Sequence, residues 1–280
     1  MIRIHIVGSP RSGTTLMHQL VVNCFDVDGY APEEMPIYYE PAQRFERFCS
    51  KWPFDVLHVR PYLAFMPDLW VIVMLRDPRD VVTSIHGKAK DMYFNNLREW
   101  RQCADAARRL RPHPRVVTLK YEELVRDPEA IEAELRQRLP FLRQVRPFAE
   151  YHVSARPSKE SLGAMHGVRP INQTSIGAWR SHKPRLAAQI RIHGPITREL
   201  VELGYEPDDG WTEELRGVTP KNGTSRFNDW EALTRKNVVA RSKRVAAVGA
   251  AFLQHRLLRP ALGRPVYLYR EVVRAEPKSA

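Results

Sequence analysis

The stretch from Gly8 to Thr15 has residue types and a spacing that suit the binding of a phosphate-like anion. It reads Gly-Ser-Pro-Arg-Ser-Gly-Thr-Thr, in which four residues separate two glycines. Backbone N–H groups of such a turn, with a helix N-terminus behind them, form a cradle for an anion. A nucleoside triphosphatase needs Lys directly after the second glycine, but Thr14 stands there and the cation is Arg11. The turn therefore predicts an anion site for which the γ-phosphate of ATP is not the natural ligand.

A second pair of polar side chains follows the apolar run Leu69–Leu75. Arg76 comes directly after this run, and Ser84 comes eight residues later, beyond Pro78, where a helix can begin. A guanidinium makes planar, charge-assisted hydrogen bonds to a phosphate, and a serine hydroxyl in the first turns of a helix adds a neutral donor. We expect this pair to bind a second anionic group.

Both motifs need a parallel sheet to position them. Three apolar runs without helical spacing predict buried strands, namely residues 2–7, 69–75 and 115–119. Helical spacing follows them at residues 14–24, from Pro78 through Ile85, and at 122–125 and 128–139. Strands that alternate with helices predict an α/β fold, a P-loop-like parallel sheet flanked by helices.

The remaining segments are less regular. Residues 55–59 fit a short strand, 151–175 a long loop, and 184–203 a helix that ends at Gly204. Beyond Trp211 we expect a poorly ordered linker over 212–229, a mostly helical segment over 230–259, and a late strand or extended arm over 264–274. The chain then divides into residues 1–211 and a C-terminal extension, residues 212–280.

The charge of the chain is strongly basic. Its 44 Lys and Arg against 32 Asp and Glu give a net charge of +12, and residues 212–280 alone contribute 14 Lys and Arg against 6 Asp and Glu. Such a balance suits nucleic acid, an anionic membrane or a polyanionic small molecule. Aromatic residues do not alternate with the basic ones and no nucleic-acid-binding motif is present, so nucleic acid is not an expected partner.

The C-terminal extension carries an apolar stripe bordered by Lys and Arg between residues 235 and 259. A basic amphipathic helix of this kind can lie on an anionic membrane and bring an enzyme to a lipid-linked substrate. Alternatively, the stripe packs against residues 1–211 or against a second subunit, which would make a homodimer.

Cysteine usage and the N-terminus predict a cytoplasmic protein. The three cysteines, Cys24, Cys49 and Cys103, fit neither a disulfide framework nor a zinc site. A strand begins at residue 2, which leaves no room for a signal peptide, and no apolar stretch is long enough to cross a bilayer. Asp26 and Asp28 fit turn residues better than metal ligands, so no metal is expected.

The run Pro10-Arg11-Ser12-Gly13-Thr14-Thr15-Leu16 resembles the 5′-phosphosulfate-binding loop of sulfotransferases that use 3′-phosphoadenosine 5′-phosphosulfate (PAPS). Residues 8–17 are most similar to the tyrosylprotein branch and its bacterial relatives. Arg76 and Ser84 match the pair that holds the 3′-phosphate in this family, and Tyr121 matches a tyrosine that lies by the adenine. The resemblance spans roughly residues 1–210 and implies an enzyme with the sulfotransferase fold and PAPS as co-substrate. It implies these donor-binding residues: Arg11, Ser12, Gly13, Thr14, Thr15, Arg76, Ser84 and Tyr121.

Sulfuryl transfer, like phosphoryl transfer, proceeds in line and depends on positioning and charge neutralisation. Arg11 is the leading candidate to balance charge at the transferring group. Lys51, in a Lys-Trp-Pro segment that resembles the family's Lys-x-Pro, is the second candidate. The hydroxyls of Ser12, Thr14 and Thr15, with the helix N-terminus, would stabilise the leaving group.

The general base is expected on a pair of glutamates after the first helix. The tyrosylprotein branch uses the second Glu of a Gly-Glu-Glu, and this chain has Pro32-Glu33-Glu34 there, so Glu34 is the candidate base and Glu33 the alternative. His58 is a rival, because other sulfotransferase branches use His.

Downstream, the resemblance is looser. Residues 169–172 and 177–180 are similar to the family's donor-covering loop and its small-x-Trp element, but Ala178 stands where the tyrosylprotein branch has Lys, with Arg180 or Lys183 as substitutes. The expected reaction is sulfuryl transfer to a hydroxyl or amine of a small-molecule, glycan-linked or lipid-linked acceptor. The alternatives are a P-loop kinase of a small molecule and a non-catalytic module that binds a ligand or a membrane surface.

Overall fold

The computed structural model describes residues 1–41, 43–86, 89–227, 229, 246, 248–250 and 252–253 of the chain. Its centre is a five-stranded sheet in the order β2-β3-β1-β4-β7, and every neighbouring pair is parallel. The strands are β1 (Ile2–Gly8), β2 (Gly29–Tyr30), β3 (Arg47–Lys51), β4 (Leu69–Leu75) and β7 (Val116–Lys120). The α/β class with a parallel central sheet is therefore confirmed.

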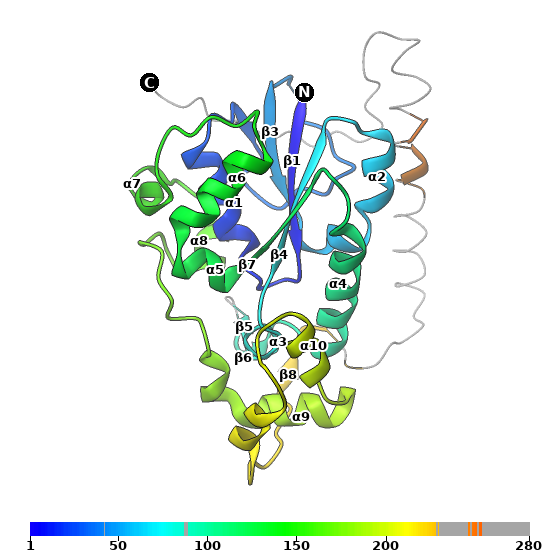
Figure 1. Cartoon of the computed structure of the whole chain (residues 1–280), viewed down its shortest axis with the longest axis vertical. Coiled ribbons are helices and arrows are strands. Elements are labelled where there is room, and N and C mark those ends of the chain that lie inside the picture. Colours follow the sequence, from blue (N-terminus) through cyan, green and yellow to red (C-terminus); the bar gives the residue numbers. More distant parts are fainter. Residues whose placement is uncertain are drawn as a thin grey trace.

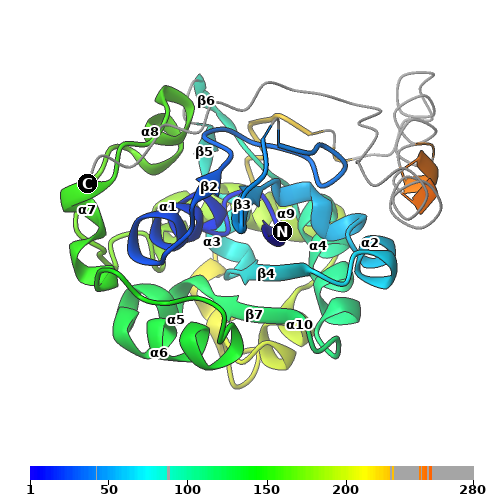
Figure 2. The same cartoon turned by 90° about the horizontal axis from the view of Figure 1, so that it is seen from above.

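Helices cover both faces of this sheet, which explains why β4 is apolar on both faces. One face carries α1 (Thr14–Cys24), α5 (Tyr121–Arg126) and α6 (Pro128–Arg138), and the other carries α2 (Arg60–Phe65) and α4 (Leu97–Leu110) (Figure 2). Alternate residues of β1 and β4 pack in two separate cores. Ile4, Ile6 and Ile72 pack in the first core, whereas Val7 and Val73 pack in the second.

A second group of elements lies beyond the carboxyl end of β4 (Figure 1). It contains α3 (Pro78–Val82), α9 (Lys183–His193), α10 (Thr197–Glu202) and a small sheet in the order β5-β6-β8. The strands of this sheet are β5 (Ile85–His86), β6 (Ala89–Tyr93) and β8 (Thr224–Ser225). A third core, which includes Val81, Trp100, Trp179 and Trp211, joins this group to α4.

Three local predictions were wrong. Residues 55–59 do not form a strand, because Pro53 starts the 3₁₀ helix η1 (Pro53–Leu57). Residues 151–175 hold two helices, α7 (Tyr151–Ser154) and α8 (Lys159–Met165), rather than a continuous loop. The single helix expected over 184–203 is interrupted after His193, where Gly194 has φ 84° and Pro195 follows, so α9 and α10 are separate. Near these segments lie further short helices, η2 (Phe148–Glu150) and η3 (Ala178–His182).

The segment expected to be a poorly ordered linker, residues 212–229, packs against the rest of the chain. It contains the end of η4 (Gly210–Leu215) and β8, which pairs in parallel with β6. Asp229 accepts hydrogen bonds from Gln189 of α9 at 3.0 Å and from Asn222 at 2.8 Å.

The helix expected from Pro78 through Ile85 is shorter than predicted, because α3 ends at Val82 and Ile85 lies in β5. The division of the chain after residue 211 stays a prediction.

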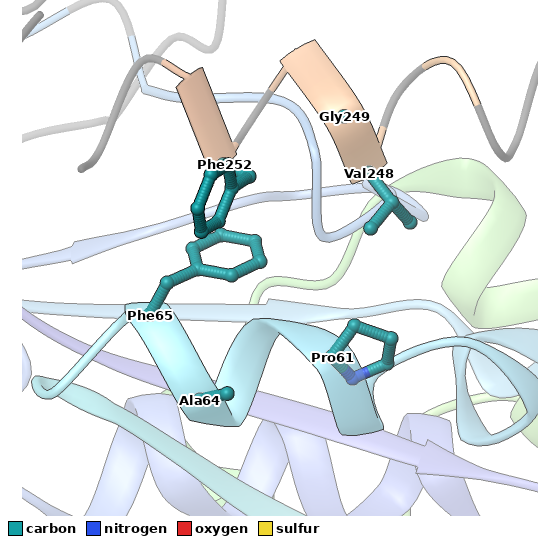
Figure 3. A pocket seen from close by; sticks show the side chains of 6 residues that line it. All are labelled: Pro61, Ala64, Phe65, Val248, Gly249 and Phe252. Carbon is teal, nitrogen blue, oxygen red and sulfur yellow. The ribbon is translucent and has the colours of Figure 1, made fainter. Parts of the chain in front are cut away.

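The helix expected over 230–259 lies mostly outside the described residues, and the arm over 264–274 lies wholly outside them. The few described residues of this extension face α2 across an apolar cavity of about 420 Å³ (Figure 3). The ring of Phe252 meets that of Phe65 edge to face at 5.7 Å, and Val248 packs against the core cluster that includes α2. Within the described part of the chain, no helix is both long and apolar enough to cross a membrane.

Candidate functional site

The turn from Gly8 to Gly13 joins β1 to α1 at the carboxyl end of the sheet. Gly13 caps α1 in the left-handed conformation with φ 90°, and Arg11 also has a positive φ of 74°. A Cβ at Gly8 would lie 2.4 Å from the carbonyl oxygen of Met74, and one at Gly13 would lie 2.6 Å from the Tyr121 ring. Both glycines are therefore required by close packing, because no larger residue fits there without displacing backbone or ring atoms.

A cavity of about 640 Å³ opens in front of this turn. It brings together eight of the residues predicted from the sequence, from both anion-binding motifs and the glutamate pair: Arg11, Gly13, Thr14, Thr15, Glu34, Arg76, Ser84 and Tyr121. Ser12, Glu33, Lys51 and His58 are not among its lining residues. The hydroxyl of Ser12 is buried behind the turn, against Gly8, and no described residue is its hydrogen-bond partner.

Arg11 connects the two anion-binding motifs. Its Nε donates to Ser84 Oγ at 2.7 Å, and its terminal nitrogen donates to the carbonyl of Ala164 at 3.2 Å. Burial, with a smaller contribution from the positive charge of Arg76, lowers the pKa of Arg11 to about 10. The side chain is still a cation at neutral pH, because that value lies well above 7.

Arg76 lies over the ring of Tyr121. Its guanidinium carbon is 4.4 Å from the centre of that ring, and an edge of the same ring packs on Gly13. The terminal nitrogens of Arg76 donate to the carbonyls of Arg11 at 2.9 Å and Ser175 at 2.7 Å. Its buried Nε has no hydrogen-bond partner among the described residues, so this side chain has a donor left for a ligand.

Glu34 forms an ion pair with Lys51 in which Oε1 and Nζ are 3.4 Å apart. The Lys51 side chain is 3% exposed at the end of β3, whereas that of Glu34 is 38% exposed and lines the cavity. Lys51 thus lies behind Glu34 as seen from the cavity. The sequence predicted Lys51 at the transferring group, whereas in the structure its ammonium group pairs with the carboxylate of the candidate base.

The other candidates do not line the cavity. Glu33 is exposed, and His58 follows the last turn of η1. Arg180 and Lys183, the expected substitutes for the lysine that Ala178 replaces, both pair with Glu214, at 2.8 and 3.3 Å. Neither basic side chain lines the cavity, whereas Ala178 does.

Several lining residues were missed by the sequence reasoning. Asp80 accepts hydrogen bonds from the backbone N–H groups of Gly177 at 2.8 Å and Trp179 at 3.0 Å, and burial raises its pKa. It therefore fixes the turn that carries Ala178. His182, whose Nδ1 is 3.2 Å from the Tyr93 hydroxyl, also lines the cavity, as does Phe94. An acidic residue at the start of a helix looks like a surface residue in sequence, so no local signal marked Asp80.

The residues similar to the donor-covering loop of the resembled family, 169–172, do line the cavity. Nearby, α8 contributes Ala164 and Met165, and His166 follows it. Burial and the neighbouring Arg11 lower the pKa of His166. Among the described residues, no group of three His, Cys, Asp or Glu side chains is arranged to hold a metal ion.

The two anion-binding motifs predicted from the sequence thus meet in front of a P-loop-like turn at the carboxyl edge of a parallel sheet. Residues 30–140 match the model of a family described as the sulfotransferase family. The matched segment contains Glu34, Lys51, Arg76, Ser84 and Tyr121, whereas the phosphate turn lies before it. This match indicates that the protein is an enzyme. No curated protein sequence matches it.

Solved structures with partial likeness include other sulfotransferase domains. The sulfotransferase domain of the olefin synthase from Synechococcus PCC 7002 is 17% identical, over 64% of this chain and 86% of that one, with a TM-score of 0.44. The sulfotransferase domain from the curacin biosynthetic pathway is 15% identical, over 72% and 97%, with a TM-score of 0.47. Retinol dehydratase, solved with retinol and adenosine 3′,5′-bisphosphate (PAP), is 12% identical over 91% of this chain and 82% of that one, with a TM-score of 0.32. The likeness to the sulfotransferase family rests on the match of residues 30–140 and not on these scores.

Proposed function

We propose that the protein transfers a sulfuryl group from PAPS to a hydroxyl or amine of an acceptor. One observation carries this proposal. The phosphate turn and the motif after β4, separated by more than sixty residues, meet in one cavity through the 2.7 Å hydrogen bond from Arg11 to Ser84. Two adjacent anion-binding motifs suit a donor with two anionic ends, a 5′-phosphosulfate and a 3′-phosphate.

The residues present fit such a donor. Neither Arg11 nor Arg76 forms an ion pair with a described carboxylate, so both positive charges remain for a ligand. The Nε of Arg76 is buried without a partner, and the positive-φ turn presents its backbone to the cavity. Tyr121 lies beside both Arg76 and Gly13, in a position to contact the nucleoside between the two anionic ends.

The proposed chemistry uses Glu34 as general base. The acceptor oxygen or nitrogen attacks sulfur in line, the bond from sulfur to the phosphate oxygen breaks, and Glu34 takes the acceptor's proton. Arg11 and the N-terminus of α1 neutralise the charge that develops on the transferring and leaving oxygens. Lys51 holds the carboxylate of Glu34 through their 3.4 Å ion pair.

The acceptor is proposed to be a small molecule or a glycan-linked or lipid-linked group. A specificity for peptide tyrosine is not proposed, because Ala178 replaces a lysine of the tyrosylprotein branch and Arg180 and Lys183 are engaged with Glu214. Mass spectrometry of a host metabolite extract, incubated with PAPS and with or without the enzyme, would identify the acceptor by its gain of a sulfate group.

Ligand-induced thermal stabilisation separates this function from its alternatives. Adenosine 3′,5′-bisphosphate (PAP) should raise the melting temperature, and ATP should raise it much less, because only a ligand that binds the folded state stabilises it. Equal shifts from PAP and ATP would instead indicate a kinase, although Thr14 rather than Lys follows Gly13. No shift from either ligand would indicate a non-catalytic module.

The role of the C-terminal extension needs its own test. The contact between Phe252 and Phe65 supports packing against the catalytic part of the chain. Truncation before Trp230 should then expose apolar surface on α2 and cause aggregation. A truncated protein that remains soluble and binds PAP would favour the membrane role, and flotation of the full chain with anionic liposomes at low salt would demonstrate it.

A further inference from the structure

Glu34, the candidate base, lies in a loop, residues 31–41, that contacts a buried cluster of polar side chains. Residues 31–41 run from β2 toward β3, and their backbone is tied to β3 by two hydrogen bonds, from Ala31 N–H to the Cys49 carbonyl and from Met35 N–H to the Lys51 carbonyl, both 2.9 Å. Glu34 lies between these two ties. The loop contains no helix or strand beyond β2, so its shape depends on contacts with other elements.

Arg3 of β1 supplies three of those contacts. Its guanidinium donates to the carbonyls of Ile37 at 2.9 Å, Tyr39 at 2.7 Å and Pro36 at 3.3 Å. The residue is 1% exposed. A buried charge is costly unless it is fully hydrogen-bonded. The three loop carbonyls therefore stabilise the buried cation of Arg3, and loss of the loop's shape would leave its N–H groups without acceptors.

Ser50, His5 and Asp55 continue the cluster back to the same loop. Ser50 Oγ is 3.2 Å from Arg3 Nε and 2.8 Å from His5 Nδ1, and His5 Nε2 is 3.0 Å from Asp55 Oδ2. The same carboxylate oxygen accepts the N–H of Ile37 at 2.6 Å. The ring thus closes, because it begins and ends on Ile37, three residues after Glu34.

The hydrogen bonds of this cluster allow one consistent assignment of donors and acceptors. The Ser50 oxygen accepts from Arg3, so its own hydrogen is available for His5 Nδ1, and Nε2–H then donates to the carboxylate, which can only accept. Burial lowers the pKa of His5, in agreement with a neutral ring. All four side chains are buried, which keeps water from competing for these bonds.

We propose that Arg3, Ser50, His5 and Asp55 form a positioning cluster that holds the loop of Glu34 at the distance from the transferring group that proton abstraction requires. The proposal rests on the proposed function, in which Glu34 is the base. None of the four residues lines the cavity, so each acts through the loop and not on the substrate. A displacement of the base by about 1 Å can cost about 100-fold in rate.

The test uses the full chain and the substitution Arg3→Met, which keeps an unbranched stem and removes every donor. Two measurements are made: hydrogen exchange of a peptide covering residues 31–41, and sulfate release from PAPS with water as the acceptor, in which water attacks sulfur and PAP leaves. We expect faster exchange in that peptide and a roughly 10- to 100-fold lower maximal rate of release, with the Kd for PAP unchanged within about 2-fold. Arg3→Lys should restore part of the rate.

Arg115→Met is the matched control. Arg115 also donates to several carbonyls, those of Met66 and Pro67 after α2 and of Leu69 at the start of β4, none of which belongs to residues 31–41 or lines the cavity. It should change neither the exchange of residues 31–41 nor the release of sulfate. If Arg3→Met does not fold, Ser50→Ala, which removes only the link between Arg3 and His5, is read by the same two measurements, with a smaller loss of about 3- to 10-fold expected.

Three results would overturn the proposal: unchanged exchange in residues 31–41, faster exchange with an unchanged rate of release, or a loss of PAP affinity that parallels the loss of rate. Failure of the proposed function looks different, because the unmodified protein would then neither bind PAP nor release sulfate. In that case the exchange measurement still decides whether the cluster holds the loop, although not whether the loop serves catalysis.

Discussion

The donor side and the base side of the cavity are built in different ways. The donor side consists of short contiguous motifs, residues 8–15 and 76–84, that directly follow the buried strands β1 and β4. The base side consists of Glu34 on an irregular loop, held by Arg3, Ser50, His5 and Asp55 from three other elements. Anion binding is thus encoded locally, whereas the place of the base is encoded by contacts between residues 17 to 50 positions apart.

The largest effect is expected on the base side. Glu34→Gln keeps the size of the side chain but removes the proton acceptor, so turnover should fall by about 10²- to 10⁴-fold with little change in the affinity for PAP. Steady-state kinetics and calorimetry measure the two quantities. Glu33→Gln, on the exposed neighbour, is the control and should retain activity. An active Glu34→Gln together with an inactive His58→Ala would show that the base is His58.

On the donor side, Arg76→Ala should weaken PAP binding without a specific effect on the acceptor. The loss of hydrogen bonds to a charged group costs about 1.5–3 kcal/mol, which corresponds to roughly 10- to 100-fold in Kd. Calorimetry with PAP measures it. An unchanged Kd would refute the assignment of Arg76 to the 3′-phosphate.

Ser84→Ala should have a smaller effect on the same affinity. A neutral hydrogen bond is worth about 0.5–1.5 kcal/mol, or roughly 2- to 10-fold in Kd. Part of this loss will come through Arg11, whose Nε donates to Ser84 Oγ. If Ser84→Ala weakens binding more than Arg76→Ala does, the main cation of this subsite is Arg11 rather than Arg76.

Acid should also destabilise the fold through a buried histidine of α1, the helix that follows the turn of the donor side. His18, which packs on β2 through Tyr30, is buried, and burial followed by the nearby charge of Lys51 lowers its pKa to about 3. The unfolded chain binds a proton near pH 6.5 that the folded chain does not bind, so stability is fully present above that pH and falls below it. The expected slope is about 1.4 kcal/mol per pH unit. Denaturation between pH 7 and 5 measures it, and His18→Gln should flatten the slope; an identical slope in that variant would contradict the assignment.

The same contrast explains what could be predicted from the sequence. Leu69–Leu75 was recognisable because a strand buried on both faces is continuously apolar. Residues 2–7 were recognisable by their β-branched residues, although Arg3 and His5 lie among them. The strand β3 was not predicted, because it ends in Ser50 and Lys51, whose burial depends on His5 and Glu34 rather than on apolar neighbours. The wrong strand at 55–59 has a related cause, since Asp55 is buried to bind His5 and Ile37 and not to alternate with apolar residues.

The C-terminal half shows the same limit. Residues 212–229 have the composition of a linker, yet Asn222 and Asp229 hydrogen-bond to Gln189 of α9. Polar side chains that pair with distant polar side chains leave no period in the sequence, so their packing could not be foreseen. Motifs that bind a ligand through the backbone, such as residues 8–15, are recognisable because their glycines are required by local geometry.

The most direct test compares the binding of PAP and of adenosine 5′-monophosphate to the unmodified protein and to Arg76→Ala by calorimetry. The account predicts that PAP binds the unmodified protein at least 10-fold more tightly, because Arg76 and Ser84 contribute charge-assisted and neutral hydrogen bonds to the 3′-phosphate. It also predicts that this difference largely disappears in Arg76→Ala. Equal affinities for the two nucleotides in the unmodified protein would contradict the claim that the two motifs bind the two anionic ends of one donor.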